Sequence, residues 1–144
     1  MGGSHGGSTT LNAVMAPASE SEAAAREKRP DFAAAVALYP RCDPTGAFRS
    51  VTPLLILIGE KDDWTPAEPC RRLTEASQRA GAPVTIKIYP RAYNSFDSAN
   101  PVRYVETRVN ASSPTGHGAT TGGDPEAWAD STHEVVAFFG RYLR

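Results

Sequence analysis

The sequence predicts an α/β fold in which about three mainly parallel strands are flanked by helices. Short apolar runs occupy residues 32–39, 53–58 and 84–89, and a proline or a glycine directly follows each of them. Segments with helix caps or helical periodicity precede the first run and follow the second and third, as in sheets whose parallel strands are joined by helical crossovers. A length of 144 residues leaves room for one domain.

Each apolar run is interpreted as a strand. Residues 53–58 are leucines and isoleucines after a proline, and they have the length of a buried strand. Residues 84–89 follow as the third strand. The run at 32–39 contains four alanines, which would also suit a helix, but its continuous apolar character favours a parallel strand covered on both faces.

Two helices are expected before the first strand. One covers residues 6–15 and begins directly after Ser4, so that its N-terminus points at that serine. Its apolar side consists of Leu11, Val14 and Met15. Ser19 and Glu22 form a capping box for the second helix, which Pro30 is expected to close.

Two more helices are expected further along the chain. Thr65 caps the first of them, with Pro66 at its first position, Glu68 completing the capping box and Gly81 at its end. The last helix begins at Asp124 and has an apolar face at helical spacing, which predicts that it packs on the sheet. That face comprises Trp128, Thr132, Val135, Val136, Phe139, Tyr142 and Leu143.

Residues 98–123 form a long excursion that contains glycines and serines. Within it, only residues 102–109 alternate like a strand. A loop of this length inside a compact domain usually has a function or is mobile. The chain, residues 1–144, is therefore interpreted as one domain that carries this excursion.

Composition and charge exclude several classes of partner. Fifteen basic and sixteen acidic residues give a formal net charge of -1, which predicts no global attraction to nucleic acid or to a membrane surface. A hydrophobic content of 40% and a mean hydropathy of -0.37 are typical of a soluble globular protein. No apolar run reaches the roughly 18 to 20 residues that span a bilayer. We therefore expect a cytoplasmic protein that binds a small molecule.

The two cysteines, Cys42 and Cys70, lack the C-x-x-C spacing of a redox or zinc site, so no metal is expected. They could form a disulfide if the fold brought them together in an oxidising compartment. For a cytosolic protein we predict two reduced thiols.

Two segments carry residues typical of a serine hydrolase. Residues 2–6 spell G-x-S-x-G, the sharp strand-to-helix turn, or nucleophile elbow, that exposes a nucleophilic serine, although no strand is expected before Ser4. Asp62 follows the second strand, at the carboxyl edge of a parallel sheet where ligands bind. We assign Asp62 as the acid that orients a base, and its neighbour Asp63 is the alternative. The loop after the third strand is expected to carry the base, and Asn94 stands at that position.

These segments resemble the dienelactone hydrolase family, and the resemblance covers nearly the whole chain. The matching segments are GSHGG at 3–7, ALYP at 37–40, GEKDDWTP at 59–66 and YPRAYNSFD at 89–97. The resemblance implies the C-terminal part of an α/β-hydrolase fold, beginning at the nucleophile elbow, with the N-terminal strands missing. It also implies hydrolysis of an ester or a lactone without a cofactor, by a triad whose nucleophile and acid are Ser4 and Asp62.

Departures from the family pattern bear on activity and substrate. The resemblance implies a histidine where this chain has Asn94, and an asparagine cannot accept and return a proton near neutral pH. The second backbone donor of the oxyanion hole is missing as well, which leaves the amide of His5 as one donor. Dienelactone hydrolases proper use cysteine as the nucleophile, so Ser4 argues against a dienelactone as the specific substrate.

Other side chains near the predicted site have two interpretations. Of the three histidines, His117 in the excursion is the candidate for a substitute base, whereas the side chain of His5 is expected to point away from Ser4 and His133 falls on the polar side of the last helix. Three aromatic residues flank the acid and base loops and line either a substrate pocket or the edge of the sheet. They are Trp64, Tyr93 and Phe96.

The sequence thus predicts a serine-type hydrolase of carboxylic esters or lactones that is impaired by Asn94 and by truncation. The alternative is a catalytically inactive fragment or pseudoenzyme that has a binding role or no role. The apolar edge of the strand at 32–39 is open to another chain, so self-association is also expected.

Overall fold

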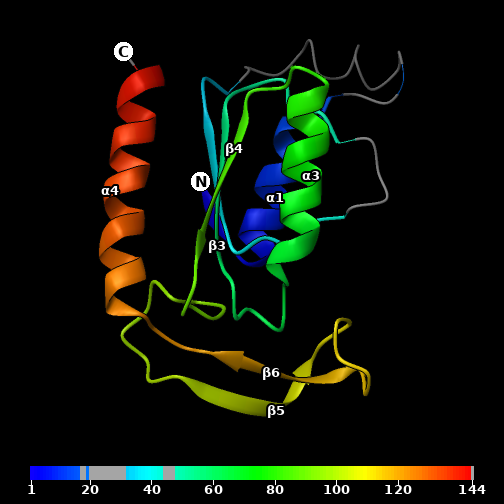
Figure 1. Cartoon of the computed structure of the whole chain (residues 1–144), viewed down its shortest axis with the longest axis vertical. Helices are drawn as coiled ribbons and strands as arrows, with labels where there is room; N and C mark the ends of the chain where they lie inside the picture. The colour runs from blue at the N-terminus through cyan, green and yellow to red at the C-terminus, as the bar shows by residue number, and fades with distance from the viewer. Residues whose placement is uncertain (17–18, 20–31, 44–47, 144) are drawn as a thin grey trace.

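The structure is a computed structural model and describes residues 1–16, 19, 32–43 and 48–143. The described residues form a parallel sheet of four strands, in the spatial order β1 (Gly2–Gly3), β2 (Ala35–Leu38), β3 (Leu54–Gly59) and β4 (Val84–Tyr89). A separate antiparallel pair consists of β5 (Arg103–Val109) and β6 (His117–Thr121). Helices α1 (His5–Val14) and α3 (Ala67–Arg79) cover one face of the parallel sheet, and α4 (Pro125–Tyr142) lies on the other (Figure 1).

Strands β2, β3 and β4 confirm the three predicted strands and the α/β class. Every residue of β2 and β3 is buried, as expected for strands covered on both faces. β2 is shorter than the predicted run at 32–39 because it begins at Ala35, and Phe32 is 57% exposed. The register places Ala37 beside Ile56 and Ile56 beside Ile86, which forms the apolar centre of the sheet.

The expectation that no strand precedes Ser4 is wrong. Gly2 and Gly3 pair in parallel with Ala37 and Leu38 of β2, because two residues are enough to form ladder hydrogen bonds with the end of that strand. β1 therefore occupies part of the edge of β2, and the sheet has one strand more than expected.

Helix α1 confirms the first predicted helix, although it begins one residue earlier, at His5. It buries Leu11 and Val14, whereas Met15 lies beyond its end and is 39% exposed. The second predicted helix, which the capping box of Ser19 and Glu22 begins, lies outside the described residues apart from Ser19 itself.

Helix α3 confirms the third predicted helix but begins differently. The N-cap position is Pro66, and no side chain caps it. The predicted capping by Thr65 is wrong, because the Thr65 hydroxyl makes its hydrogen bonds outside the helix, to Tyr39 and Asp62. Gly81, with a φ of 78°, follows the end of the helix as predicted.

Helix α4 begins as predicted, because the Asp124 carboxylate accepts hydrogen bonds from two amides of the first turn at 3.1 and 3.0 Å. The predicted apolar face is confirmed in part, because Val135 and Phe139 pack against the core, whereas its other members are exposed. Each of Trp128, Val136, Tyr142 and Leu143 is at least 41% exposed. The residues that α4 buries instead are Ala127, Ser131 and Phe138. Helical spacing did not distinguish two adjacent stripes, and the ion pairs of Lys87 in β4 with Asp130 and Glu134 agree with the orientation of the helix.

The long excursion forms an antiparallel hairpin at the carboxyl end of the parallel sheet (Figure 1). β5 confirms the strand-like alternation at 102–109, and β6 was not predicted because its residues are small or polar. Gly118 in β6 has a φ of 87°, and a Cβ there would lie 1.7 Å from the Tyr104 hydroxyl. A glycine is therefore required where Tyr104 crosses the hairpin.

Cys42 and Cys70 form a disulfide, so the prediction of two reduced thiols is wrong. The fold brings the loop after β2 against α3, with a Cα–Cα distance of 5.0 Å between the two cysteines. Both are buried. The disulfide therefore joins the segment that follows β2 covalently to the helix that follows the acid loop.

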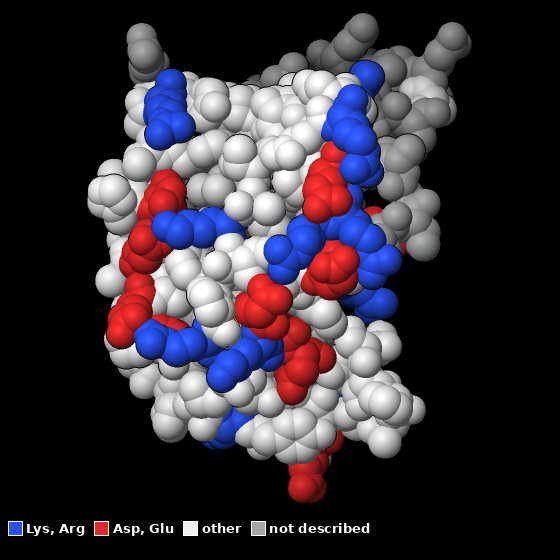
Figure 2. Space-filling model, viewed as in Figure 1, with Lys and Arg blue, Asp and Glu red and all other residues white. Residues whose placement is uncertain are grey.

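Lys and Arg side chains are interspersed with Asp and Glu side chains over the face shown in Figure 2. Ion pairs of Arg71 with Glu60 and of Arg91 with Glu126 join different segments of the chain. No helix within the described ranges is both long enough and apolar enough to cross a membrane.

The glycines of α1 provide a test of how closely this helix packs on the sheet. A Cβ at Gly7 would lie 2.7 Å from the Leu38 carbonyl oxygen, whereas a Cβ at Gly6 would have no neighbour within 4 Å. We expect Gly7→Ala to lower the free energy of unfolding by about 1–3 kcal/mol, as overpacked cores do. Gly6→Ala, the matched control, is expected to raise it by about 0.5–1 kcal/mol. Urea unfolding followed by circular dichroism measures both, and equal effects would contradict the packing of α1.

The disulfide is expected to stabilise the fold by constraining the unfolded chain. Removing it by Cys42→Ala with Cys70→Ala is expected to cost about 2–4 kcal/mol of unfolding free energy. Thiol titration of the natural chain, unfolded without reductant, is expected to detect no free thiol. Two reactive thiols in that experiment would show that the cysteines are not paired.

Candidate functional site

The residues predicted to carry the chemistry follow three strands of one parallel sheet, in which β2 lies between the first and the second of them. Ser4 follows β1, Asp62 lies in the loop after β3, and Asn94 lies in the loop after β4. Because the carboxyl ends of parallel strands meet at the same edge, all three lie at the edge where ligands of such sheets bind. The Ser4 amide also donates a hydrogen bond to the carbonyl of Leu38, at 3.0 Å, which ties it to the end of β2.

Ser4 has an unusual backbone conformation. Its φ of 52° and ψ of -117° are rare for a residue other than glycine and carry strain. A Cβ at Gly2 would lie 2.4 Å from the Gly6 carbonyl oxygen, so the chain crosses itself closely there. Gly6 itself has open space around it, and the second close approach is made by Gly7 against β2. The turn thus requires small residues at positions 2 and 7.

Asp62 is the carboxylate at the centre of the site. It is 3% exposed, and its Oδ1 accepts hydrogen bonds from the amides of Trp64 and Thr65 at 3.0 and 2.8 Å. Its Oδ2 accepts from the Thr65 hydroxyl at 2.8 Å and from the Asn94 side-chain amide at 3.0 Å. Burial raises the pKa of Asp62 above its ordinary value, and the hydrogen bonds from Thr65, Asn94 and Trp64 oppose that rise.

Asn94 is fully buried beside Asp62. Its side-chain Nδ2 donates to Asp62 Oδ2 and to Thr65 Oγ1, at 3.0 Å in each case, while its Oδ1 accepts from the Ser95 hydroxyl at 3.2 Å. Asn94 therefore presents a hydrogen-bond donor to the acid, as the ring N–H of a histidine would. It offers no ring nitrogen that could take a proton from a serine.

Ser4 lies at the same edge of the sheet as Asp62 and Asn94, but it is not joined to them by a side-chain hydrogen bond. Within the described part of the chain, the Ser4 side chain forms no hydrogen bond to Asp62 or Asn94. The connection runs through the end of β2. The carbonyl of Leu38 accepts from the Ser4 amide, and the carbonyl oxygen of the next residue, Tyr39, lies 3.1 Å from the Thr65 hydroxyl, within hydrogen-bond distance.

Asp63, the alternative acid, points to the hairpin instead. Its carboxylate accepts from the amide and the hydroxyl of Thr120, at 2.8 Å each. The adjacent carboxylates thus have separate partners, and Asp62 is the one that meets Asn94.

All three histidines are exposed, and none of them forms a hydrogen bond to Asp62 in the part of the chain that the structure describes. His5 is exposed at the first position of α1, and His133 is exposed on α4. His117 is exposed at the start of β6 and pairs with Val109. The other end of β6, Thr121, is the part that contacts Asn94, and the four intervening residue steps of a strand span about 13 Å.

Tyr39 is a site residue that sequence reasoning missed. Its φ is 36°, and its hydroxyl donates to Asp97 at 2.7 Å. The hydroxyl also lies against Gly3, where a Cβ would approach it to 2.8 Å. Burial and the Asp97 carboxylate raise the pKa of Tyr39 far above its ordinary value. Tyr39 thus joins the turn before Ser4 to the loop that carries Asn94, and only its place at the end of a strand signalled this.

The predicted aromatic lining is divided between core and surface. Phe96 is fully buried between the rings of Tyr39 and Tyr89, with centroid distances of 5.4 and 5.1 Å. The indole N–H of Trp64 donates to the Val109 carbonyl at 3.0 Å, and its ring lies 4.7 Å from the Arg108 guanidinium. Phe96 therefore packs the sheet edge, and Trp64 anchors the hairpin.

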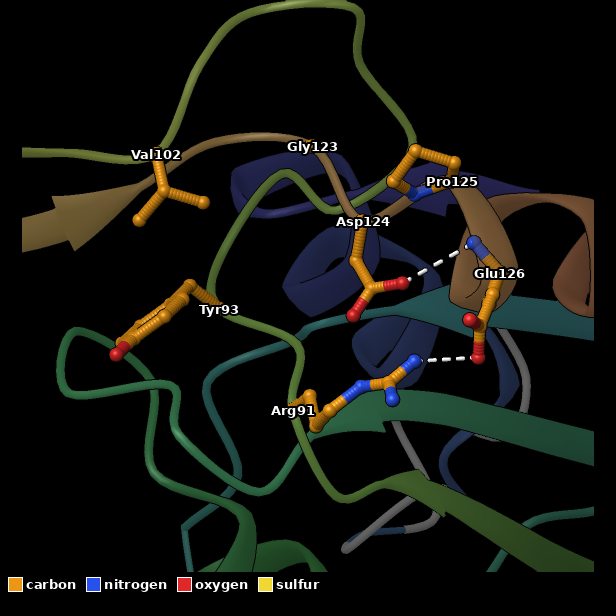
Figure 3. A pocket seen from close by; sticks show the side chains of 7 residues that line it. All are labelled: Arg91, Tyr93, Val102, Gly123, Asp124, Pro125 and Glu126. Atoms are coloured by element: carbon orange, nitrogen blue, oxygen red, sulfur yellow. Dashed lines mark hydrogen bonds and ion pairs between the residues drawn. The ribbon is translucent and has the colours of Figure 1, made fainter.

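Tyr93 lines a cavity of about 270 Å³ together with residues of the start of α4 (Figure 3). Two of the lining residues, Arg91 and Glu126, form an ion pair, and a third, Asp124, caps α4 (Figure 3). Asn94 and Asp62 do not line this cavity. Among the described residues, no group of three or more His, Cys, Asp or Glu side chains is placed to hold a metal ion.

Residues 21–143 of the chain match the sequence model of the dienelactone hydrolase family. This range includes Asp62 and Asn94, whereas Ser4 and His5 precede it. No curated protein matches the chain.

Solved structures of similar fold include proteins from Klebsiella pneumoniae and Thermogutta terrifontis. A candidate dienelactone hydrolase from Klebsiella pneumoniae is 21% identical, with a TM-score of 0.58, and the match covers 95% of this chain and 49% of that one. Thermogutta terrifontis esterase 2 phosphorylated by paraoxon is 19% identical, with a TM-score of 0.61 and coverage of 96% and 51%. The same esterase phosphonylated by cyclosarin is 19% identical, with a TM-score of 0.62, and the match covers 97% of this chain and 52% of that one. The fold is thus that of part of an α/β-hydrolase, and the chain spans about half the length of these proteins.

The raised pKa of Asp62 predicts a pH dependence of stability. Between the ordinary carboxyl pKa and the raised one, the folded chain binds more protons than the unfolded chain, so stability falls as pH rises through this window. The natural chain is therefore expected to lose stability relative to Asp62→Asn as pH is raised from about 4. Urea midpoints of both proteins from pH 4 to 8 test this, and a relative gain with rising pH would contradict it.

Proposed function

Because the chain belongs to the dienelactone hydrolase family, we propose that it forms part of a serine-type hydrolase of carboxylic esters or lactones, with Ser4 as nucleophile and Asp62 as acid. The observation that carries the proposal is the direct hydrogen bond between Asp62 and residue 94 at the carboxyl edge of the sheet. This is the contact by which the acid of a triad orients its base. The strained turn at Ser4, at the end of β1 in the same sheet, supports the proposal.

The turn from β1 through Ser4 into α1 has the features of a nucleophile elbow. A positive φ at the serine and close backbone approaches at Gly2 and Gly7 are what a sharp strand-to-helix turn requires. In the proposed reaction the Ser4 hydroxyl attacks the carbonyl carbon of the ester. α1 begins at His5, whose amide has no acceptor within the helix and serves as a donor to the oxyanion.

Asn94 limits this chemistry. In a triad the base takes the serine proton during attack and returns it to the leaving alcohol. Asn94 holds the place of the base against Asp62 but has no group that titrates near neutral pH. Loss of a triad member lowers turnover by roughly 10³-fold or more, so the natural chain is expected to be a weak hydrolase.

The substrate class rests on the family and on the related structures. The Thermogutta terrifontis esterase is described with paraoxon, cyclosarin and tabun adducts and with propionate bound. These describe that protein, and for this chain they favour a carboxylic ester over other bonds.

A second candidate function is binding without turnover, and Asn94 is the observation that favours it. A buried asparagine satisfies the Asp62 carboxylate and so preserves the edge of the sheet without the base. Such a chain would keep the geometry of the site and bind a ligand there, but it would not hydrolyse it.

Turnover of p-nitrophenyl acetate by four proteins tests the hydrolase proposal. We expect Asn94→His to raise kcat/KM by about 10³-fold or more over the natural chain, because the imidazole supplies the missing base. Ser4→Ala in each background is the control, and it is expected to abolish the gain. A gain that survives Ser4→Ala would remove Ser4 from the mechanism, and no gain in a folded Asn94→His protein would favour binding without turnover.

A further inference from the structure

The hydroxyl of Thr65 occupies the junction of three segments at the carboxyl edge. It lies 2.8 Å from Asp62 Oδ2, 3.1 Å from the Tyr39 carbonyl oxygen and 3.0 Å from Asn94 Nδ2. Thr65 itself is 8% exposed. The hydroxyl does not cap α3, because that helix begins after Pro66 without a side-chain cap.

From this geometry we infer that Thr65 is a positioning residue for Asp62, which it holds against residue 94. The inference rests on the proposed function insofar as Asp62 is the acid of the reaction. It extends that function to a residue that touches neither the substrate nor the serine.

A threonine hydroxyl has one proton to donate and two lone pairs that accept. The two protons of Asn94 Nδ2 satisfy Asp62 Oδ2 and Thr65 Oγ1, one each. Two acceptors, the Asp62 carboxylate and the Tyr39 carbonyl, then compete for the single Thr65 proton.

The charge of Asp62 decides this competition. When Asp62 is ionised, the Thr65 proton points to its Oδ2, because hydrogen bonds to a charged acceptor are the stronger ones. When Asp62 is protonated, its own O–H donates to Thr65 Oγ1, and the Thr65 proton turns to the Tyr39 carbonyl. Thr65 therefore satisfies the buried carboxyl group in both states.

The hydrogen bonds from Thr65 affect the pKa of Asp62, because that carboxyl group is buried. Burial raises the pKa of Asp62, and the amide and hydroxyl of Thr65 are the first of the contacts that oppose the rise. Tyr39, directly after β2, is a titratable side chain whose pKa is raised by burial, by the Asp97 carboxylate and, to a lesser extent, by the Asp62 carboxylate, so Tyr39 stays neutral. Asn94 and the Trp64 amide are uncharged. The ionised form of the acid therefore depends on neutral hydrogen-bond donors.

Variants of Thr65 in the full chain test the inference without any activity assay. The readout is the acid dissociation constant of Asp62, followed by NMR in protein labelled with ¹³C-carboxyl aspartate and assigned by the loss of its signal in Asp62→Asn. Thr65→Val is expected to lower this constant about tenfold, the effect of losing one hydrogen bond to a charged group. Thr65→Ser, which keeps the hydroxyl, is expected to leave it within about twofold.

Thr74→Val is the matched control. Thr74 is 2% exposed in α3, and its hydroxyl has no hydrogen-bond partner within the described residues. Its replacement removes a buried hydroxyl without touching Asp62, so the dissociation constant of Asp62 is expected to stay unchanged. If Thr65→Val does not fold, Thr65→Ala carries the same comparison with a smaller side chain.

A second measurement connects Thr65 to turnover in the Asn94→His background. There Thr65→Val is expected to lower kcat about tenfold with KM unchanged, and Thr65→Ser to retain kcat. An Asp62 constant that does not respond to Thr65→Val would overturn the positioning role even if Asn94→His is active. An inactive Asn94→His protein whose Asp62 responds to Thr65 would overturn the proposed function and leave the positioning role supported.

Discussion

The hydrogen bond from the Asn94 amide to the Asp62 carboxylate holds together the carboxyl edge of this sheet. It joins the loop after β3 to the loop after β4 across a site from which water is excluded. A buried carboxylate without donors is costly, and here four donors from three residues surround it. The position of each neighbouring loop depends on satisfying this one group.

Under the proposed function, this requirement explains how an asparagine can stand at the position where a triad would have its histidine. The structural half of the histidine's role is to donate a hydrogen bond to the acid, and a side-chain amide does this equally well. The chemical half is to carry a proton, and an amide cannot do it. The same residue can therefore preserve the fold and remove the base.

The hairpin is held to the same loops from the outside. Asp62 faces inward to Asn94, while the next residue, Asp63, binds Thr120 of β6. The Asn94 carbonyl accepts from the Gly122 amide at 3.0 Å, so both acid and base loops contact the hairpin. Asn110 adds a hydrogen bond to the Asp63 carbonyl at 2.9 Å. The hairpin and the acid loop thus position each other at the edge where a substrate would enter.

Local sequence patterns were enough to predict the three central strands, because each apolar run and the proline or glycine after it can be recognised within a few residues. Only contacts between distant segments established that Gly2 and Gly3 pair with β2, that Cys42 and Cys70 meet, and which residues of α4 are buried. The same holds for Thr65: its spacing predicted a helix cap, but in the structure its hydroxyl forms a hydrogen bond with Asp62 instead. Such contacts join segments that are far apart in the sequence, so they depend on how the sheet assembles. A buried carboxylate needs hydrogen-bond donors, and those donors come from loops that only the assembled sheet brings together.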